Sequence, residues 1–354
     1  MRTKKGKLIY NLITFALVTA AYFICADMVA KGNMSRTLRG QLIPICAWIV
    51  MAISLNLVIG ISGELSLGHA GFMSVGAFTG IVVSGWLLNG FQMENTALRL
   101  FLAIIAGGVA AAIAGVIIGI PVLRLRGDYL AIVTLAFGEI IRNVMNCVYV
   151  SVEDSRLHLG FINPNLPGKP LINGPMGAID VKRISTFLAG FLLVVFTLLV
   201  VLNLINSRSG RAIMAIRDNR IAAESMGINV TKYKMMAFVL SAALAGMAGV
   251  LYGLNMNTLV PAKFSFDQSI NVLVFVVLGG IGNILGSVIS ATLLTVLPEV
   301  LRAFSQYRML VYAIVLILVM LATNNPILRS WFNRLADWIK GLVSRKGKEA
   351  AKHE

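Results

Sequence analysis

Residues 60–76 read Gly60-Ile-Ser-Gly-Glu-Leu-Ser-Leu-Gly-His-Ala-Gly-Phe-Met-Ser-Val-Gly76 and lie between two hydrophobic runs. This glycine-rich stretch carries a carboxylate, Glu64, and an imidazole, His69. Within a lipid bilayer, irregular backbone and ionisable side chains are tolerated only where protein or a water-filled path surrounds them. The stretch therefore predicts a membrane protein with a hinge or a polar entry to a pathway between two spanning helices.

The composition is that of a polytopic helical membrane protein. Of the 354 residues, 58% are hydrophobic and 13% are charged, whereas a soluble domain has about 25% charged residues. The formal net charge is +16, but lysine and arginine lie in tails and short loops, which argues against nucleic acid as a partner. Cys25, Cys46 and Cys147 fall in apolar runs without metal-site spacing, so we interpret them as core residues and expect no metal.

About ten segments have the length and apolar character of a spanning helix, which needs about 20 residues. They cover residues 8–29, 42–60, 65–88, 98–123, 128–150, 185–205, 235–255, 270–283, 285–300 and 309–323. Glycines interrupt the region 270–300, which fits either two short helices or one long interrupted helix. The sequence predicts an all-α membrane protein with a single domain at 1–330 and a basic cytoplasmic tail at 331–354.

The distribution of Lys and Arg predicts the orientation. With the N-terminus in the cytoplasm, the basic loop at 206–234 and the basic tail also lie in the cytoplasm, as the positive-inside rule requires. The hydrophobic run at 8–28 is longer than a signal-peptide core, so we expect an uncleaved span. The loop at 31–41 departs from the rule, because it places Lys31, Arg36 and Arg39 outside.

The connection at 151–184 is rich in proline, asparagine and glycine. It contains Asn163-Pro-Asn-Leu-Pro-Gly-Lys-Pro170 and Asn173-Gly-Pro175. These residues favour turns. We therefore expect a turn-rich external segment with little regular structure.

The loop at 206–234 has the pattern of short helices. Ile213 and Ile216 recur at helical spacing, Asp218 or Asn219 is suited to cap a second helix, and Gly227 is suited to end it. An amphipathic helix with an exposed apolar stripe either lies on lipid or docks in a groove of a partner. We predict one or two surface helices on the cytoplasmic face.

Polar residues in and near the spans are candidates for a translocation path. Glu139 and Arg142 lie three residues apart on one helix face, where they can pair. A lone charge at the bilayer centre costs about 2.5–3.5 kcal/mol on insertion scales, so we expect a structural ion pair, with a substrate or gating role as the alternative. The path candidates are Glu64, Ser66, His69, Thr134, Glu139 and Arg142.

Glycines four residues apart allow helix backbones to approach closely. Such pairs occur at Gly76 and Gly80, Gly115 and Gly119, Gly249 and Gly253, and Gly282 and Gly286. They indicate a tightly packed bundle or a seam with a partner. The positions that we predict to act as hinges or packing sites are Gly63, Gly68, Gly71, Gly279, Gly280 and Gly282.

The 206–234 loop contains Arg217-Asp-Asn-Arg-Ile-Ala-Ala-Glu-Ser-Met-Gly227, which resembles the coupling loop of ABC importer permeases of the branched-chain amino acid family. Other stretches are similar to that family and follow its order: Leu55-Asn-Leu-Val-Ile-Gly60, Gly63-Glu-Leu-Ser-Leu-Gly-His-Ala-Gly-Phe72, Gly127-Asp-Tyr-Leu-Ala-Ile-Val-Thr-Leu-Ala-Phe-Gly-Glu-Ile140, Asn173-Gly-Pro-Met-Gly177 and Leu278-Gly-Gly-Ile-Gly-Asn283. The resemblance covers roughly residues 42–325 and points to the LivM-type subunit. One departure is the Pro/Asn-rich segment near 155–175, where many members carry a glycine- and arginine-rich motif.

The resemblance implies a permease of the bacterial inner membrane that moves branched-chain or hydrophobic amino acids by alternating access. It implies two ABC ATPase subunits, a LivH-like sister permease, an extracytoplasmic amino-acid-binding protein and membrane lipid as partners. The residues that it assigns to coupling are Arg217, Asp218, Ala222, Ala223, Glu224 and Gly227. The sequence has no Gly-x-x-x-x-Gly-Lys-Ser/Thr motif, so we expect ATP and Mg on the partner subunits and no cofactor on this chain.

Two alternatives remain open on the sequence alone. A sugar-type ABC permease has the same architecture and differs in its cargo. A secondary transporter driven by H⁺ or Na⁺ would use Glu64, His69 and Glu139 as ion sites, although carboxylates are scarce in the spans. We do not expect an enzyme, because the serines lack a base at a supportable spacing.

Overall fold

The computed structural model describes residues 4–32, 34–125, 127–153, 156–162 and 166–301, together with residues 310, 313, 314 and 317. The chain divides into two compact units, residues 1–296 and 297–354. The first unit contains the helical bundle. The predicted tail at 331–354 lies outside the described residues, as does most of the predicted helix at 309–323.

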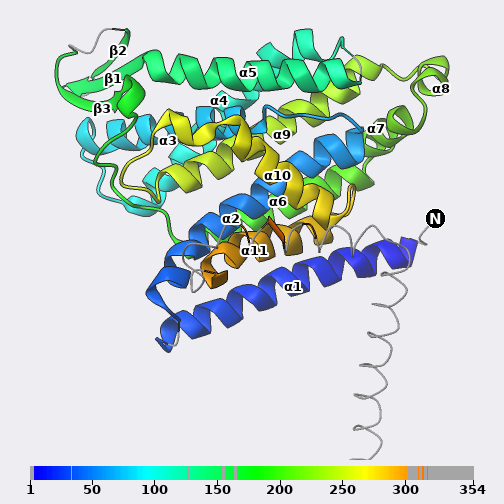
Figure 1. Cartoon of the computed structure of the whole chain (residues 1–354), viewed down its shortest axis with the longest axis horizontal. Helices are drawn as coiled ribbons and strands as arrows, with labels where there is room; N and C mark the ends of the chain where they lie inside the picture. The colour runs from blue at the N-terminus through cyan, green and yellow to red at the C-terminus, as the bar shows by residue number, and fades with distance from the viewer. Residues whose placement is uncertain are drawn as a thin grey trace, which may run out of the picture. The chain divides into compact units, whose positions relative to one another are not determined.

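Helices make up most of the first unit (Figure 1). The long helices are α1 (Lys4–Ala30), α2 (Arg36–Asn56), α3 (His69–Asn89), α4 (Thr96–Val122), α5 (Asp128–Cys147), α6 (Phe187–Asn206) and α9 (Val230–Gly253). The shorter ones are α7 (Arg208–Asp218), α8 (Arg220–Ser225), α10 (Phe266–Gly279) and α11 (Ile284–Val300). A π-helical turn, η1 (Leu57–Ser62), extends α2, and 3₁₀ turns occupy Gly174–Met176 and Pro261–Phe264.

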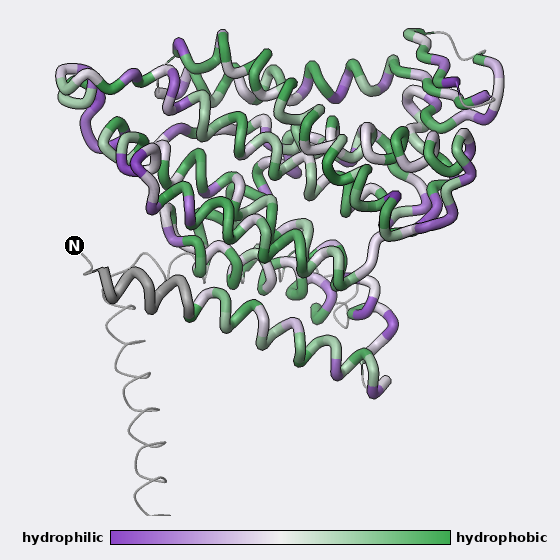
Figure 2. Tube along the Cα trace, turned by 180° about the vertical axis from the view of Figure 1, so that it is seen from behind, coloured by the Kyte–Doolittle hydropathy of each residue, from purple (hydrophilic) through white to green (hydrophobic). Residues whose placement is uncertain are grey.

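The described residues include seven helices that are long and apolar enough to cross a membrane, namely α1 to α6 and α9. Helices α10 and α11 are apolar but shorter. They are separate helices, because the residues at 280–283 break the chain between them, which answers the question left open for 270–300. Hydrophobic residues fill the lengths of the helices, whereas hydrophilic residues gather at the two ends of the bundle (Figure 2).

Helix α9 lies at the centre of the bundle and packs against α2, α3 and α4. Its residues Leu244 and Leu251 and the α2 residues Met51 and Leu55 are fully buried. Burial of such side chains stabilises the packed helices through close contact, because a protein interior is packed as densely as an organic crystal. Helix α9 therefore forms much of the buried core of the bundle.

Glycines bring α3 and α9 into backbone contact. A Cβ atom at Gly249 would lie within 3.0 Å of the carbonyl oxygen of Met73, and one at Gly76 would lie as close to the carbonyl oxygen of Gly246. Real Cβ atoms essentially never show such distances. Gly76 and Gly249, which belong to the predicted glycine pairs, therefore pack helices together within this chain.

We expect Gly249→Ala to destabilise the protein, because overpacking a tight contact costs about 1–3 kcal/mol. Thermal unfolding of the purified protein in detergent measures the loss. Gly40→Ala is the matched control, since a Cβ there meets nothing within 4 Å and alanine favours a helix more than glycine does. Equal unfolding temperatures for the two variants would contradict the close contact.

The connection between α5 and α6 contains a three-stranded antiparallel sheet, so the expectation of little regular structure at 151–184 is wrong. Its strands are β1 (Val148–Glu153), β2 (Arg156–Phe161) and β3 (Lys169–Asn173), in the order β2-β1-β3. Val150 pairs with Leu159 on one side and with Ile172 on the other. Alternating β-branched residues favour β1, and Pro170 is tolerated because β3 is an edge strand.

Candidate functional site

The helical structure is interrupted between α2 and α3, next to the α7–α8 loop. The π-helical turn η1, which follows α2, ends at Ser62, and Gly63 follows with a φ of 77°. Helix α3 begins at His69, four residues later than the predicted helix at 65–88. Because π-helical turns are rare and often occur at functional sites, this break, residues 60–68, is the starting point of the candidate site.

A buried ion pair joins the break to α9. Lys234 Nζ contacts Glu64 Oε1, and the two side chains are 14% and 5% exposed. Burial raises the pKa of the Glu64 carboxyl, and the hydrogen-bonded ammonium group of Lys234 opposes this rise. Glu64 Oε2 is buried and has no hydrogen-bond partner among the described residues. Sequence reasoning missed Lys234, which it counted only toward the orientation.

Arg217 joins the same break to α7. Its Nη1 donates to the carbonyl oxygen of Gly60 at 2.6 Å, and its Nη2 donates to Asp218 Oδ1 at 3.1 Å. The aliphatic part of Arg217 lies against Gly63, where a Cβ atom would be 2.5 Å from Arg217 Cγ. The structure thus brings together Arg217, Gly63 and Glu64, which the sequence assigned to separate groups.

His69 and Ser66 have other surroundings. His69 Nε2 lies 2.8 Å from Ser54 Oγ, and the carbonyl oxygen of Ser54 accepts a hydrogen bond of 2.6 Å from Ser241 Oγ. Ser66 Oγ is buried without a hydrogen-bond partner in the described part of the chain. Glu64 and His69 therefore bind different partners, Lys234 and Ser54.

Helix α5 packs against the end of the break. The backbone N–H of Leu67 donates to Thr134 Oγ1 at 3.0 Å. A Cβ atom at Gly68 would lie within 3.0 Å of the carbonyl oxygen of Thr134, and one at Gly71 would lie 3.1 Å from Gly138 Cα. The positions Gly68 and Gly71 are thus sites of close helix packing, and Thr134 holds the backbone of the break.

Glu139 and Arg142 form the ion pair expected on α5. Arg142 Nη2 lies 2.7 Å from Glu139 Oε2, and both side chains are 31% exposed. Arg142 Nε is buried and has no hydrogen-bond partner among the described residues. The pair lies on the face of one helix and is separate from the contacts of Glu64.

Asn56 connects α2 to the break between α10 and α11. Its Nδ2 donates to Ser287 Oγ at 2.8 Å, and its Oδ1 accepts from the N–H of Gly282 at 2.8 Å. Sequence reasoning missed this residue. Asn56 could have been recognised as a single amide side chain within an apolar run. A buried amide needs hydrogen-bond partners, so such a residue predicts polar contacts with another segment.

Gly279 and Gly282 of the α10–α11 break lie against other backbone, whereas a Cβ atom at Gly280 would meet only Asn283 of the same turn. Gly280 and Gly282 have φ values of 91° and 81°, which glycine adopts without the penalty of a Cβ atom. A Cβ atom at Gly60 would lie within 3.0 Å of the N atom of Gly282, and one at Gly279 within 3.0 Å of the backbone of Gly286. The two glycine-rich breaks of the chain therefore touch each other.

The loop at 206–234 forms two capped helices. The N–H of Gly210 donates to Ser207 Oγ at 3.1 Å at the start of α7, and the N–H of Ala222 donates to Asn219 Oδ1 at 3.0 Å at the start of α8. Asn219 is therefore the cap. Gly227 follows α8 with a φ of 77°, and its N–H donates to the carbonyl oxygen of Glu224 at 3.0 Å.

The apolar stripe of α7 is buried. Ile213 and Ile216 are 1% and 3% exposed, so the expectation of an exposed stripe on this helix is wrong, because the chain itself covers it. Ala223 of α8 packs with Ile216 and Val230.

The exposed side of the loop lies on and next to α8, at the end of the bundle away from the sheet (Figure 1). Ile221 and Met226 are 77% and 82% exposed. Ala222 is exposed as well. Glu224 Oε1 lies 3.0 Å from Arg220 Nε.

The contacts around the break link α2, α7, α9 and α11 through side chains that bond to backbone or to one another. No group of three or more His, Cys, Asp or Glu residues within the described ranges is placed to hold a metal ion. Through Arg217, α7 is in direct contact with the glycine-rich backbone between α2 and α3.

Comparisons with known proteins agree with these features. Residues 40–321 match the family described as branched-chain amino acid transport system / permease component. The chain is 36% identical to the high-affinity branched-chain amino acid transport system permease protein LivM of Salmonella typhimurium and 35% identical to that of Escherichia coli, in each case over 77% of this chain and 66% of the relative. It is 30% identical to the ribose import permease protein RbsC of Escherichia coli, over 78% of this chain and 81% of RbsC. No solved structure matches the chain.

The match to the two LivM relatives spans slightly less than two thirds of their length. The family model, in contrast, matches most of this chain, including the break at 60–68, the α7–α8 loop and the α10–α11 break. Seven apolar helices of spanning length in the described part of the chain agree with a multi-pass membrane protein. The chain therefore belongs to the family of permease components of branched-chain amino acid transport systems.

Proposed function

We propose that this chain is the membrane-spanning permease subunit of an ATP-driven importer of branched-chain amino acids. The similarity to two LivM proteins supports this cargo. The contact of Arg217 with Gly60 is the structural observation that carries the proposal, because it joins a loop suited to receive force to a glycine-rich break suited to move. A sugar-type permease is the second candidate, supported by the 30% identity to RbsC.

The partners in this proposal are two ATPase subunits, a LivH-like sister permease and an extracytoplasmic amino-acid-binding protein. Ile221 and Met226 supply exposed apolar side chains on a short helix, which suits docking in a hydrophobic groove of an ATPase subunit. Ala223 anchors the helix on the permease side. ATP and Mg bind to the ATPase subunits.

The proposed topology places the chain in the bacterial inner membrane with about ten spans and both termini in the cytoplasm. The spans are the seven long helices, α10, α11 and residues 309–323. The α7–α8 loop then lies in the cytoplasm and the sheet outside. The basic residues of the loop support this orientation under the positive-inside rule.

The proposed mechanism is alternating access. Closure of the ATPase pair displaces α8, Ala223 passes the displacement to α7 and α9, and Arg217 passes it to Gly60. The backbone around Gly63 is the hinge, while the pair of Glu64 and Lys234 holds the break against α9. Because interfaces and packed cores switch between discrete arrangements, a small shift at α8 can reopen the path on the other side.

Uptake by proteoliposomes tests the function. We expect the complex reconstituted from this chain, its ATPases, its sister permease and its binding protein to accumulate L-leucine when ATP is supplied inside. Ribose uptake without leucine uptake would favour the sugar-type alternative. Leucine uptake that follows an ion gradient and needs no ATPase would contradict the proposal.

A further inference from the structure

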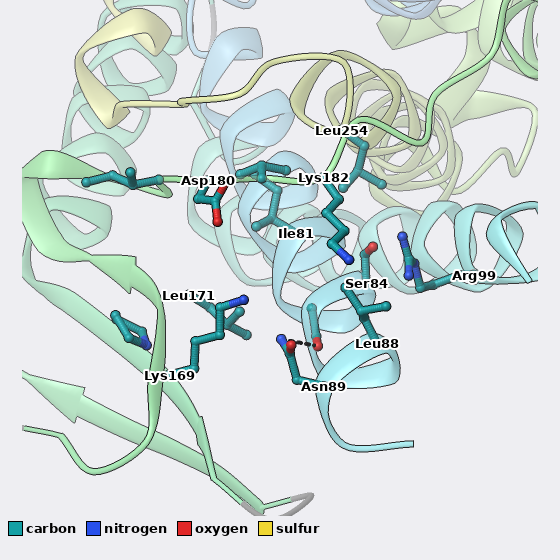
Figure 3. A pocket seen from close by; sticks show the side chains of 14 residues that line it. Ile81, Ser84, Leu88, Asn89, Arg99, Lys169, Leu171, Asp180, Lys182 and Leu254 are labelled. Atoms are coloured by element: carbon teal, nitrogen blue, oxygen red, sulfur yellow. Dashed lines mark hydrogen bonds between the residues drawn. The ribbon is translucent and has the colours of Figure 1, made fainter. Parts of the chain in front are cut away.

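A pocket with polar and apolar walls lies at the end of the bundle that carries the sheet (Figure 3). Helices α3 and α4, strand β3 and the segment at 179–182 line it. Its volume is about 40 Å³, which gives room for about three water-sized groups. The candidate site around Glu64 shares no residue with this pocket.

Arg99 of α4 lies in the wall of the pocket and is 2% exposed. Its Nε is buried and has no hydrogen-bond partner among the described residues. Its Nη1 makes a long contact of 3.5 Å with the carbonyl oxygen of Met93. A buried guanidinium is unfavourable unless it is paired and fully hydrogen-bonded, so the pocket wall offers an unsatisfied cation to a small anion.

The rim of the pocket carries charges of both signs. Lys182 and Asp180 extend into the opening from one segment (Figure 3), and Lys169 extends from β3. Within the described ranges, none of these three side chains forms an ion pair. The rim can therefore attract a carboxylate toward the lysines and an ammonium group toward Asp180.

Apolar side chains complete the lining. Ile81 and Leu88 of α3 and Leu254, after α9, lie beside the charged groups. Pockets that combine apolar walls with a few placed polar groups are typical of small-molecule sites. Three cations, one carboxylate and an aliphatic wall offer partners for the α-carboxylate, the α-ammonium group and the side chain of a branched-chain amino acid.

We propose that this pocket is a binding site for an amino acid on the external side of the permease. Arg99 binds the α-carboxylate, Asp180 faces the α-ammonium group, and the side chain of the amino acid lies against Leu88 at the opening. The volume of about 40 Å³ admits the α-carboxylate to Arg99, so the ammonium group lies at the rim and the aliphatic part extends across the opening. This site takes its cargo class from the proposed function and gives that cargo a first position on the permease.

Binding to the full-length chain in phosphatidylcholine nanodiscs tests the site without any transport. We expect L-leucine to bind at least tenfold more tightly than L-leucinamide, which lacks the carboxylate. Arg99→Gln should weaken leucine binding at least tenfold, whereas Arg156→Gln, a change in β2 outside the pocket, should not alter it. Asp180→Asn should weaken leucine severalfold and leave 4-methylpentanoate, which has no ammonium group, unchanged.

Asp180→Asn and Lys182→Gln keep the test decisive if Arg99→Gln does not fold, because both residues are exposed. Equal binding of leucine and leucinamide, or competition by inorganic phosphate as strong as that by leucine, would overturn the site. The result also separates the two proposals. If a complex binds leucine with this selectivity but transports no leucine, only the proposed function is contradicted. If leucine transport is unchanged in the Arg99 and Asp180 variants, only the proposed site is contradicted.

Discussion

Lys234→Met is expected to destabilise the folded protein by about 3–5 kcal/mol, since removing one partner of a buried ion pair leaves the other charge uncompensated. Glu64, whose side chain is 5% exposed, would keep a buried carboxylate with neither oxygen paired. Chemical or thermal unfolding in detergent measures the loss.

The same variant should show a defined pH dependence. Burial raises the pKa of Glu64, and the variant lacks the lysine that opposes this rise. A group whose pKa is higher in the folded state favours folding at low pH and loses that contribution as the pH rises through the folded pKa. The destabilisation by Lys234→Met should therefore be greatest at high pH and should shrink as the pH falls.

Two controls test the pairing. Glu64→Met combined with Lys234→Met should recover much of the stability, because replacing a buried pair with apolar side chains is often neutral. Lys232→Met changes an exposed lysine in the same turn of α9 and should have little effect. A loss of stability in Lys232→Met as large as that in Lys234→Met would contradict the importance of the buried pair.

Ile221→Asp with Met226→Asp is expected to lower ATP-driven uptake more than tenfold, because it puts charges at the centre of the proposed apolar contact with the ATPase. Residues at the centre of an interface dominate binding. Both side chains are largely exposed in this chain, so folding and insertion should be unchanged. Co-purification of the ATPase subunits measures the contact directly.

Leu159→Asp is the matched control for this variant. Leu159 is 73% exposed and lies in β2, at the other end of the bundle (Figure 1). It should leave co-purification of the ATPases unchanged. Retention of the ATPases by the doubly substituted α8 variant would contradict the docking role of this helix.

The hydrophobic runs predicted the helices well because length and apolar character nearly determine a spanning helix. The largest error was at β1, whose alternating valines were assigned to the predicted helix at 128–150 and to the turn-rich segment that follows it. The predicted helix at 42–60 also ends too early, because the π-helical turn η1, which apolar runs do not signal, follows α2 and continues to Ser62. Strand pairing and helix irregularities depend on neighbours in space, which a linear pattern does not contain.

The sequence suggested several residues of the candidate site, but it did not predict which of them contact one another. Glu64 and Gly63 were selected from a local pattern and Arg217 from the family resemblance. The carbonyl of Gly60, to which Arg217 donates, lies 157 residues away in the sequence. Lys234 was overlooked because a lysine near a helix end is usually an orientation signal. The partner of a buried charge is set by packing, and only the three-dimensional arrangement identifies it.

The link between Arg217 and Gly60 is the central claim, and the ratio of leucine transported to ATP hydrolysed tests it most directly. In proteoliposomes, Arg217→Met should keep ATP hydrolysis within about twofold of the wild type while uptake falls about tenfold. Arg208→Met, an exposed arginine at the start of α7, should behave like the wild type. An Arg217→Met complex that transports leucine at the wild-type ratio would contradict the account.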